Sequence, residues 1–172
     1  EERCLAILRQ LGLQVATGPE VESPFYNFDA LNIPPHHPAR DMQDTFWVQG
    51  ELVLRSHTST IQARTLEKRL PLPLKFASPG RAYRNEAVDA THLAMFHQLE
   101  GFWVEQGLTF AHLKGVLSFV AGSLYPGRKF RFKPKFYPYT EPSVGLDIAC
   151  TSCGGEGCDA CHQAGWVTII GA

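Results

Sequence analysis

Polar and aromatic residues that suit the binding of a charged ligand stand close together in the middle of the chain. Arg84 and Glu86 alternate within residues 81–86, and Gln98 and Glu100 alternate within residues 96–101. Because side chains alternate across a β-strand, a hairpin of the two segments would bring these four onto one sheet face. Arg84 could bind phosphate oxygens through two hydrogen bonds. Phe96 could stack on a purine, and Gln98 and Glu100 could accept hydrogen bonds from an ammonium group. The pattern predicts a site for a ligand with a phosphate, an amine and a flat base.

An antiparallel sheet with a solvated polar face is the alternative explanation of this alternation. The segment between the two strands, residues 89–96, argues against it. It holds no glycine, no proline and no tight-turn signal, and it contains His92. Long, specific loops between strands are more often functional than simple connections.

Four cysteines near the end of the chain form two C-x-x-C pairs with a glycine-rich spacer: Cys150, Cys153, Cys158 and Cys161. Four thiolates at this spacing can surround one Zn²⁺ tetrahedrally, usually in a structural site. Strand-like segments at 144–148 and 166–170 place the cysteines at the tip of a β-hairpin, a knuckle of about residues 148–166. Disulfides are the competing explanation, but paired C-x-x-C spacing fits a metal better.

Composition sets few limits on function. The chain has 172 residues, of which 44% are hydrophobic, enough for one domain with a substantial core. Its formal net charge of −1 predicts no nucleic-acid binding by charge alone. The basic run at 128–135 alternates with phenylalanines that extend to Phe136, so we expect the rings inside and the cations outside. That outer face is either simply solvated or a phosphate track.

The hydrophobic patterns predict few helices and many short strands. Helices are expected from the stripe at residues 4–11, after a cap at Thr58 or Ser59, and after a cap at Thr109. Strands are expected at 45–48 and 52–54, and Pro79-Gly80 is expected to turn into the hairpin. No apolar run is long enough to cross a bilayer and no signal peptide begins the chain, which favours a cytoplasmic protein. The fold class predicted is α+β, with an antiparallel sheet flanked by helices.

The segments Arg84-Asn85-Glu86 and Phe96-His97-Gln98-Leu99-Glu100-Gly101 resemble motif 2 of the class II aminoacyl-tRNA synthetases. Together with residues 26–32, 37–42, 57–59 and 140–142, they make nearly the whole chain similar to the α subunits of bacterial phenylalanyl-tRNA synthetases. The resemblance implies the class II catalytic fold, with residues 1–172 as part of that catalytic domain. Both ends look cut, and motif 3 would lie beyond Ala172. We therefore expect a fragment that is inactive alone.

The resemblance also implies a reaction and its partners. L-Phenylalanine would react with ATP to give phenylalanyl-adenylate, and the acyl group would pass to tRNA(Phe). A β subunit would complete an α₂β₂ assembly. Arg84 would hold the α-phosphate, Glu86 the adenine edge or the amine region, and His92 the outer phosphates. Phe96 would stack on adenine.

The remaining implied roles concern the amino acid and Mg²⁺. The residues that would orient the amino acid are Gln43, His57, Ser59, Gln98 and Glu100. Tyr137 and Tyr139 stand where the family usually has phenylalanines that line the specificity pocket. Glu141 would bind Mg²⁺ together with the β subunit, or would only cap the turn at Pro142. Likewise, Ser59 either lines the pocket or only caps a helix.

Two other functions stay open at this point. The cysteine knuckle could be an interaction module for RNA or protein, with the sheet as its scaffold. The chain could also be a synthetase-like paralogue that makes an adenylate but charges no tRNA.

Overall fold

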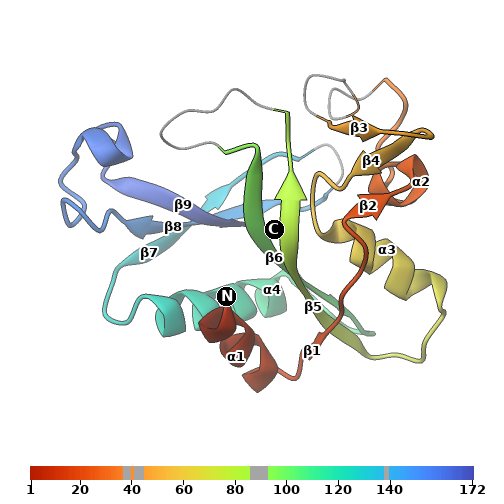
Figure 1. Ribbon diagram of the computed structural model, residues 1–172. Coiled ribbons are helices and arrows are strands. Elements are labelled where there is room, and N and C mark those ends of the chain that lie inside the picture. Colours follow the sequence, from red (N-terminus) through yellow and green to blue (C-terminus); the bar gives the residue numbers. More distant parts are fainter. Residues whose placement is uncertain (37–39, 41–44, 86–92, 138–139) are drawn as a thin grey trace. The chain divides into compact units, whose positions relative to one another are not determined.

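The computed structural model describes residues 1–36, 40, 45–85, 93–137 and 140–172. The chain divides into two compact units, Glu1–Gln106 and Gly107–Ala172, and each is described by itself (Figure 1). Within the described residues, no helix has the length and apolar character needed to span a membrane.

The described part of the first unit combines short helical segments with strands. Its helical segments are α1 (Glu2–Gln10), α2 (Pro24–Asn27), the 3₁₀ turn η1 (Asp29–Leu31) and α3 (Ser59–Glu67). Its strands are β1 (Gln14–Val15), β2 (Val21–Glu22), β3 (Trp47–Val48), β4 (Leu52–Leu54), β5 (Leu74–Tyr83) and β6 (Met95–Val104). The expected helices at 4–11 and after Thr58 are therefore confirmed.

The long antiparallel hairpin of β5 and β6 is the main feature of this unit and is drawn in green in Figure 1. Its strands pair without a register shift from Leu74 opposite Val104 to Tyr83 opposite Met95. This confirms the predicted hairpin, although β5 begins and ends earlier than the expected 81–86, and β6 extends beyond the expected 96–101 at both ends. β1 pairs with β5 in parallel, which departs from the purely antiparallel expectation. A second small sheet has the strand order β2-β4-β3.

The prediction of a turn at Pro79-Gly80 is wrong, because both residues lie inside β5. The N–H of Arg84 donates to Ala94 O across the hairpin, so the backbone polar groups of Tyr83 point to the opposite edge. Pro79 has the same parity as Tyr83, and its missing N–H therefore faces away from β6. A proline is tolerated at such a position because no ladder hydrogen bond is lost.

The second unit packs one helix on a three-stranded sheet. It contains α4 (Phe110–Leu124), β7 (Phe130–Pro134), β8 (Val144–Ala149), the 3₁₀ turn η3 (Asp159–Cys161) and β9 (Trp166–Gly171). The strand order is β7-β8-β9, antiparallel throughout. Leu117 and Ala121 of α4 pack on Val144, Leu146 and Ile148. The Thr109 cap is confirmed, since its hydroxyl and the His112 ring form a capping box.

The alternation predicted for the basic run holds only around Phe132, since Phe130 was also expected inside but is 38% exposed. Phe132 packs against the helix–sheet core, while Arg131 and Lys133 are exposed on the other face. Phe136 was expected inside but is 85% exposed. It lies beyond Pro134, where β7 ends, so the two-residue period no longer sets its direction.

An ion pair between the half-buried Arg64 and the buried Glu22 joins α3 to β2. Both oxygens of Glu22 accept hydrogen bonds from Arg64 at 2.7 Å, and the Glu22 side chain is 0% exposed. The ring of Tyr26 lies 3.9 Å from the Arg64 guanidinium carbon. We expect Arg64→Ala to lower the free energy of unfolding by about 3 kcal/mol, because it leaves a buried carboxylate without its cation.

Arg81→Ala is the matched control for denaturant unfolding, because Arg81 pairs with Glu20 at the surface. Its loss should stay below about 1 kcal/mol. Equal losses for the two variants would contradict the assignment of the Glu22–Arg64 pair to the core.

Candidate functional site

The register of β5 and β6 places the predicted ligand-binding side chains on one face. This hairpin face is defined by three register pairs: Ser78 with Glu100, Gly80 with Gln98, and Ala82 with Phe96. Arg84 belongs to the same face, because its N–H donates to Ala94 O at 2.9 Å and so continues the pairing. Its guanidinium carbon lies 5.0 Å from the centre of the Phe96 ring.

The loop 56–59, which leads into α3, is hydrogen-bonded to this hairpin face. The backbone N–H of Thr58 donates to Gln98 Oε1 at 3.2 Å, and the Ser59 hydroxyl donates to Glu100 Oε2 at 2.7 Å. Arg84 Nε donates to Ser56 O at 3.3 Å. No side-chain cap bond occurs at the start of α3, so Ser59 directs its hydroxyl to Glu100. The loop and the hairpin therefore form one polar cluster.

Asn27, which the sequence analysis did not single out, holds this loop from the other side. Its side-chain amide donates to Ser56 Oγ and accepts from Ser56 N, each at 3.1 Å, and its backbone oxygen lies 3.0 Å from His57 Nε2. Asn27 is 0% exposed. The signal in the sequence was one amide between the aromatic residues Tyr26 and Phe28, where a buried polar group needs partners.

The His57 ring is largely shielded from solvent and neutral. Burial lowers its pKa from 6.5 to about 4, and the charges of Arg84 and Arg55 act in the same direction, against the hydrogen bond to Asn27. Because the Asn27 carbonyl only accepts, Nε2 carries the proton, and Nδ1 is left as an acceptor. Nδ1 is buried and has no hydrogen-bond partner in the part of the chain that the structure describes.

Glu100 also responds to burial, which raises its pKa, while the Ser59 hydrogen bond and the charge of Arg84 oppose the shift. A buried carboxylate gains most from a cation placed beside it. Together, Glu100, the Gln98 oxygen and His57 Nδ1 are acceptors that suit an ammonium group. Arg84, on the same face, suits an anion.

Several predicted site residues lie outside the described residues: Gln43, Glu86, His92 and Tyr139. Tyr137 and Glu141 belong to the second unit. The Tyr137 hydroxyl lies over Gly171, where an added side chain would overlap it, and Glu141 is exposed between β7 and β8. The proposed roles of all six stay predictions.

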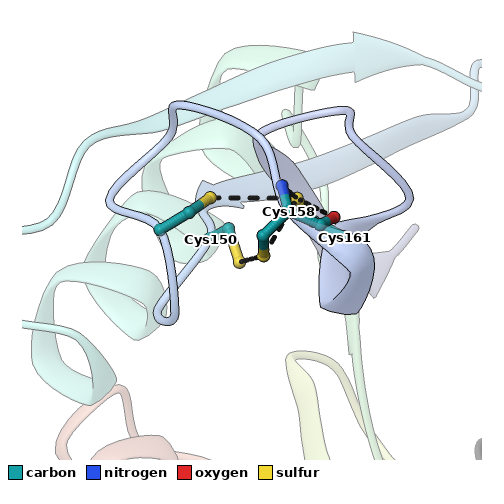
Figure 2. A group of neighbouring side chains, drawn as sticks. Cys150, Cys158 and Cys161 are labelled. Atoms are coloured by element: carbon teal, nitrogen blue, oxygen red, sulfur yellow. Dashed lines mark hydrogen bonds between the residues drawn. The ribbon is translucent and has the colours of Figure 1, made fainter.

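The four cysteines converge between β8 and β9, at the predicted hairpin tip. Their sulfur atoms all lie within 4.8 Å of one another. The sulfur–sulfur distances are 3.8 Å for Cys150–Cys158, 3.9 Å for Cys153–Cys161 and 3.7 Å for Cys158–Cys161. Figure 2 shows the sulfurs of Cys150, Cys158 and Cys161 directed toward one another. A tetrahedral metal with bonds of about 2.3 Å needs sulfurs about 3.8 Å apart. The cluster could therefore hold a metal.

The electrostatics of the cysteines fit a cation as well. Backbone N–H groups of Cys153 and Ser152 lower the pKa of Cys150 to about 6. Burial, together with the neighbouring sulfurs, raises the pKa of Cys158 to about 11. Four thiolates would repel one another here, and a divalent cation would remove that repulsion. Amide N–H groups of Gly157, Cys158 and Gly165 already donate to the sulfurs, each at 3.2 Å.

Comparison with known proteins gives matches over the whole chain. The family model of the tRNA synthetases class II core domain (F) matches residues 1–172. The phenylalanine–tRNA ligase alpha subunit of Pelobacter propionicus is 53% identical over 174 aligned residues, covering 100% of this chain and 50% of that protein. The subunit of the same name from Geobacter sulfurreducens is 54% identical over 167 residues, covering 96% and 49%. The chain thus spans about half the length of the curated relatives it matches.

Solved structures share the fold. Two structures of pyrrolysyl-tRNA synthetase from Desulfitobacterium hafniense match with TM-scores of 0.67 and 0.68, at 21% and 19% identity. They cover 84% and 86% of this chain and 52% and 56% of those chains. The predicted fold class is confirmed.

We expect the His57 ring to stay neutral until the pH falls to about 4. The unfolded chain takes up this proton near pH 6.5. Between these values the unfolded state binds more protons, so the free energy of unfolding falls as the pH falls through this window. NMR titration of the labelled ring measures the pKa, and His57→Asn should remove this part of the pH dependence. A His57 pKa of 6.5 or above would contradict the burial argument.

Proposed function

The chain belongs to the family of the tRNA synthetases class II core domain (F), and we propose from this that it is part of a phenylalanine–tRNA ligase. In this proposal the complete enzyme activates L-phenylalanine with ATP to give phenylalanyl-adenylate and pyrophosphate, and then acylates tRNA(Phe). Residues 1–172 form part of the catalytic domain, and the cysteine knuckle at about 148–166 is an insertion in it. A β subunit of the same enzyme is the proposed partner, and the cytoplasm, where tRNA is charged, is the proposed location.

The observation that carries this proposal is the polar cluster between the hairpin face and the loop 56–59. Its half-buried acceptors on Glu100 and Gln98 and the buried Nδ1 of His57 suit the α-ammonium group of an amino acid, and Ser59 fixes the Glu100 carboxylate. Gln43 is proposed to lie near the substrate carboxylate, and Tyr137 and Tyr139 to line the side-chain pocket. A pocket without a built partner for a substrate hydroxyl favours phenylalanine over tyrosine by shape.

Arg84 is proposed to bind the α-phosphate of ATP, which the carboxylate of the amino acid attacks. The substrate carboxylate oxygen attacks the α-phosphorus, a new P–O bond forms, and pyrophosphate leaves with the electrons of the broken bond. A guanidinium on the α-phosphate would stabilise the charge that develops on its oxygens. We assign the outer phosphates to His92, the adenine edge to Glu86 and stacking on adenine to Phe96. Mg²⁺, when bound, would neutralise phosphate charge, and the exposed carboxylate of Glu141 is its proposed ligand, shared with the β subunit.

Phenylalanine-dependent ATP–pyrophosphate exchange by the full-length protein with its β partner tests this function. We expect exchange with L-phenylalanine to be faster than with L-tyrosine. Arg84→Ala should lower kcat by about 10²-fold or more, because a donor to the developing charge is lost. Glu100→Gln should raise the KM for phenylalanine by about 10-fold or more, because a charged hydrogen bond to the ammonium group is lost.

Glu105→Gln is the matched control, since Glu105 is exposed and, within the described residues, accepts its hydrogen bond from the nearby Trp103 ring. It should leave both constants unchanged. Equal exchange rates with phenylalanine and tyrosine would contradict the proposed substrate. The chain of residues 1–172 alone should show little exchange, and robust turnover would contradict its assignment as part of the site.

The cysteine cluster favours a second candidate, an interaction module for RNA or protein, for which the sheet is only a scaffold. A synthetase-like paralogue that charges no tRNA is a further alternative. ATP binding that is lost in Arg84→Ala but kept in Cys158→Ser supports the ligase, and the opposite pattern supports the interaction module. Exchange without acylation of tRNA(Phe) supports the paralogue.

We infer that the cysteine knuckle holds one structural Zn²⁺ on Cys150, Cys153, Cys158 and Cys161. Its separations near 3.8 Å and its N–H donors to sulfur support this metal over a pair of disulfides. Purified protein should contain about one zinc per chain by elemental analysis. Cys158→Ser should lose the zinc and unfold at lower temperature, because the bound metal stabilises the fold.

Cys4→Ser serves as the control, because Cys4 lies on α1 and outside the cluster. It should keep the zinc. Cobalt substitution should give the absorption of a tetrahedral thiolate complex, and two disulfides in freshly purified protein would contradict the zinc assignment.

A further inference from the structure

Arg55 closes an open edge of the hairpin. It follows β4, is 3% exposed, and lies beside β5 beyond the two residues that pair with β1. Its backbone oxygen accepts from Tyr83 N at 2.9 Å, and its side-chain Nε donates to Arg81 O at 2.7 Å. One residue therefore satisfies both a donor and an acceptor on the edge of β5 that faces away from β6.

The guanidinium of Arg55 also reaches across to the chain before β2. Nη1 donates to Gly18 O at 3.1 Å and to Pro19 O at 3.3 Å, and the Arg55 backbone N–H donates to Glu20 O at 2.9 Å. These bonds match the charge of a buried cation with carbonyl oxygens. Only the planar fork of an arginine offers donors in these directions at once, so lysine is a poor substitute.

Gly80 provides the space for this guanidinium. A side-chain carbon added at Gly80 would overlap Nη2 of Arg55, so the group lies directly over the hairpin face beside Gln98. These contacts account for the presence of both Pro79 and Gly80 within a strand. Pro79 needs no partner at this edge, and Gly80 leaves room for the side chain that closes it.

Arg55 thus connects the two halves of the polar cluster. It holds the end of β5, where Arg84 follows Tyr83, and it directly precedes the loop 56–59. The Arg84 side chain spans the same junction, because its Nε donates to Ser56 O. Resting on the function proposed above, we propose that Arg55 is a positioning residue for adenylate formation, which fixes the phosphate-binding Arg84 relative to the amino-acid-binding loop 56–59.

This role predicts a particular kinetic change. In a variant at Arg55, the amino acid still meets Glu100 and His57, and the phosphate still meets Arg84, but the two groups are no longer held in the geometry of attack. Misplacement of reacting groups by about 1 Å can cost 10²-fold in rate. The loss therefore falls on kcat, while the KM values for phenylalanine and ATP change little.

We would measure phenylalanine-dependent exchange in the full-length protein with its β partner, with rates divided by the active-site concentration from a single-turnover burst. Arg55→Lys should lower kcat per active site about 10- to 100-fold, with both KM values within about 3-fold of wild type. Arg64→Lys is the control, because the side-chain hydrogen bonds of Arg64 run to Glu22 and not to the loop 56–59, so it should lower thermal stability while kcat per active site is kept. A wild-type kcat in Arg55→Lys would overturn the proposal. Absence of exchange in the wild type would instead overturn the proposed function.

Gly80→Ala tests the same guanidinium without changing Arg55, and it serves if Arg55→Lys does not fold. Its methyl group should displace Nη2 and lower kcat, while Gly115→Ala, at a helix position with open space, should not. Because lysine vacates the space over Gly80, the double variant Arg55→Lys/Gly80→Ala should be no slower than Arg55→Lys alone. Multiplicative losses, or an unchanged Gly80→Ala, would overturn the proposal.

Discussion

The unshifted pairing of β5 with β6 is the constraint on which the site depends. Side chains alternate along a strand, so a slip of one residue would turn Gln98 and Glu100 to the opposite face from Arg84. With the observed register, these three residues and Phe96 share one face. The loop 56–59 then bonds to the same side chains, which both orients them and buries them.

Burial of polar groups gives this cluster its chemical character. It lowers the pKa of His57, so the ring is neutral and its Nδ1 is an acceptor without a partner among the described residues. It raises the pKa of Glu100, so a cation placed beside this carboxylate would stabilise its charged form. These acceptors are held in place by Asn27 and Ser59 before any ligand arrives, so little ordering cost remains for binding. Arg55 holds the backbone in a similar way, because its hydrogen bonds to Tyr83 and Arg81 fix the end of β5 that Arg84 directly follows. The cysteine cluster in the second unit is organised differently, around four sulfur atoms that could hold a metal.

Sequence patterns predicted the parts of this arrangement that depend on local spacing. The alternation around Arg84 and Glu100 predicted the hairpin, and the paired C-x-x-C spacing predicted the cysteine cluster. Arg55 and Asn27 escaped prediction because their partners lie 26 to 37 residues away, too far for any periodicity to reveal. Pro79-Gly80 was interpreted as a turn, because a proline followed by a glycine is locally typical of turns. These two residue types carry no information about which groups lie along the edge of the strand. On the edge of β5 that faces away from β6, the short β1 pairs with Phe76 and Ala77, and Arg55 bonds Tyr83 and Arg81.

A crystal structure of the full-length protein with its β partner and a non-hydrolysable analogue of phenylalanyl-adenylate tests the central claim most directly. We expect the ammonium group of the analogue to lie within hydrogen-bonding distance of Glu100 and His57, while Arg84 contacts the phosphate mimic from the same hairpin face. An analogue bound with its ammonium group away from Glu100, or with Arg84 directed to another surface, would contradict it.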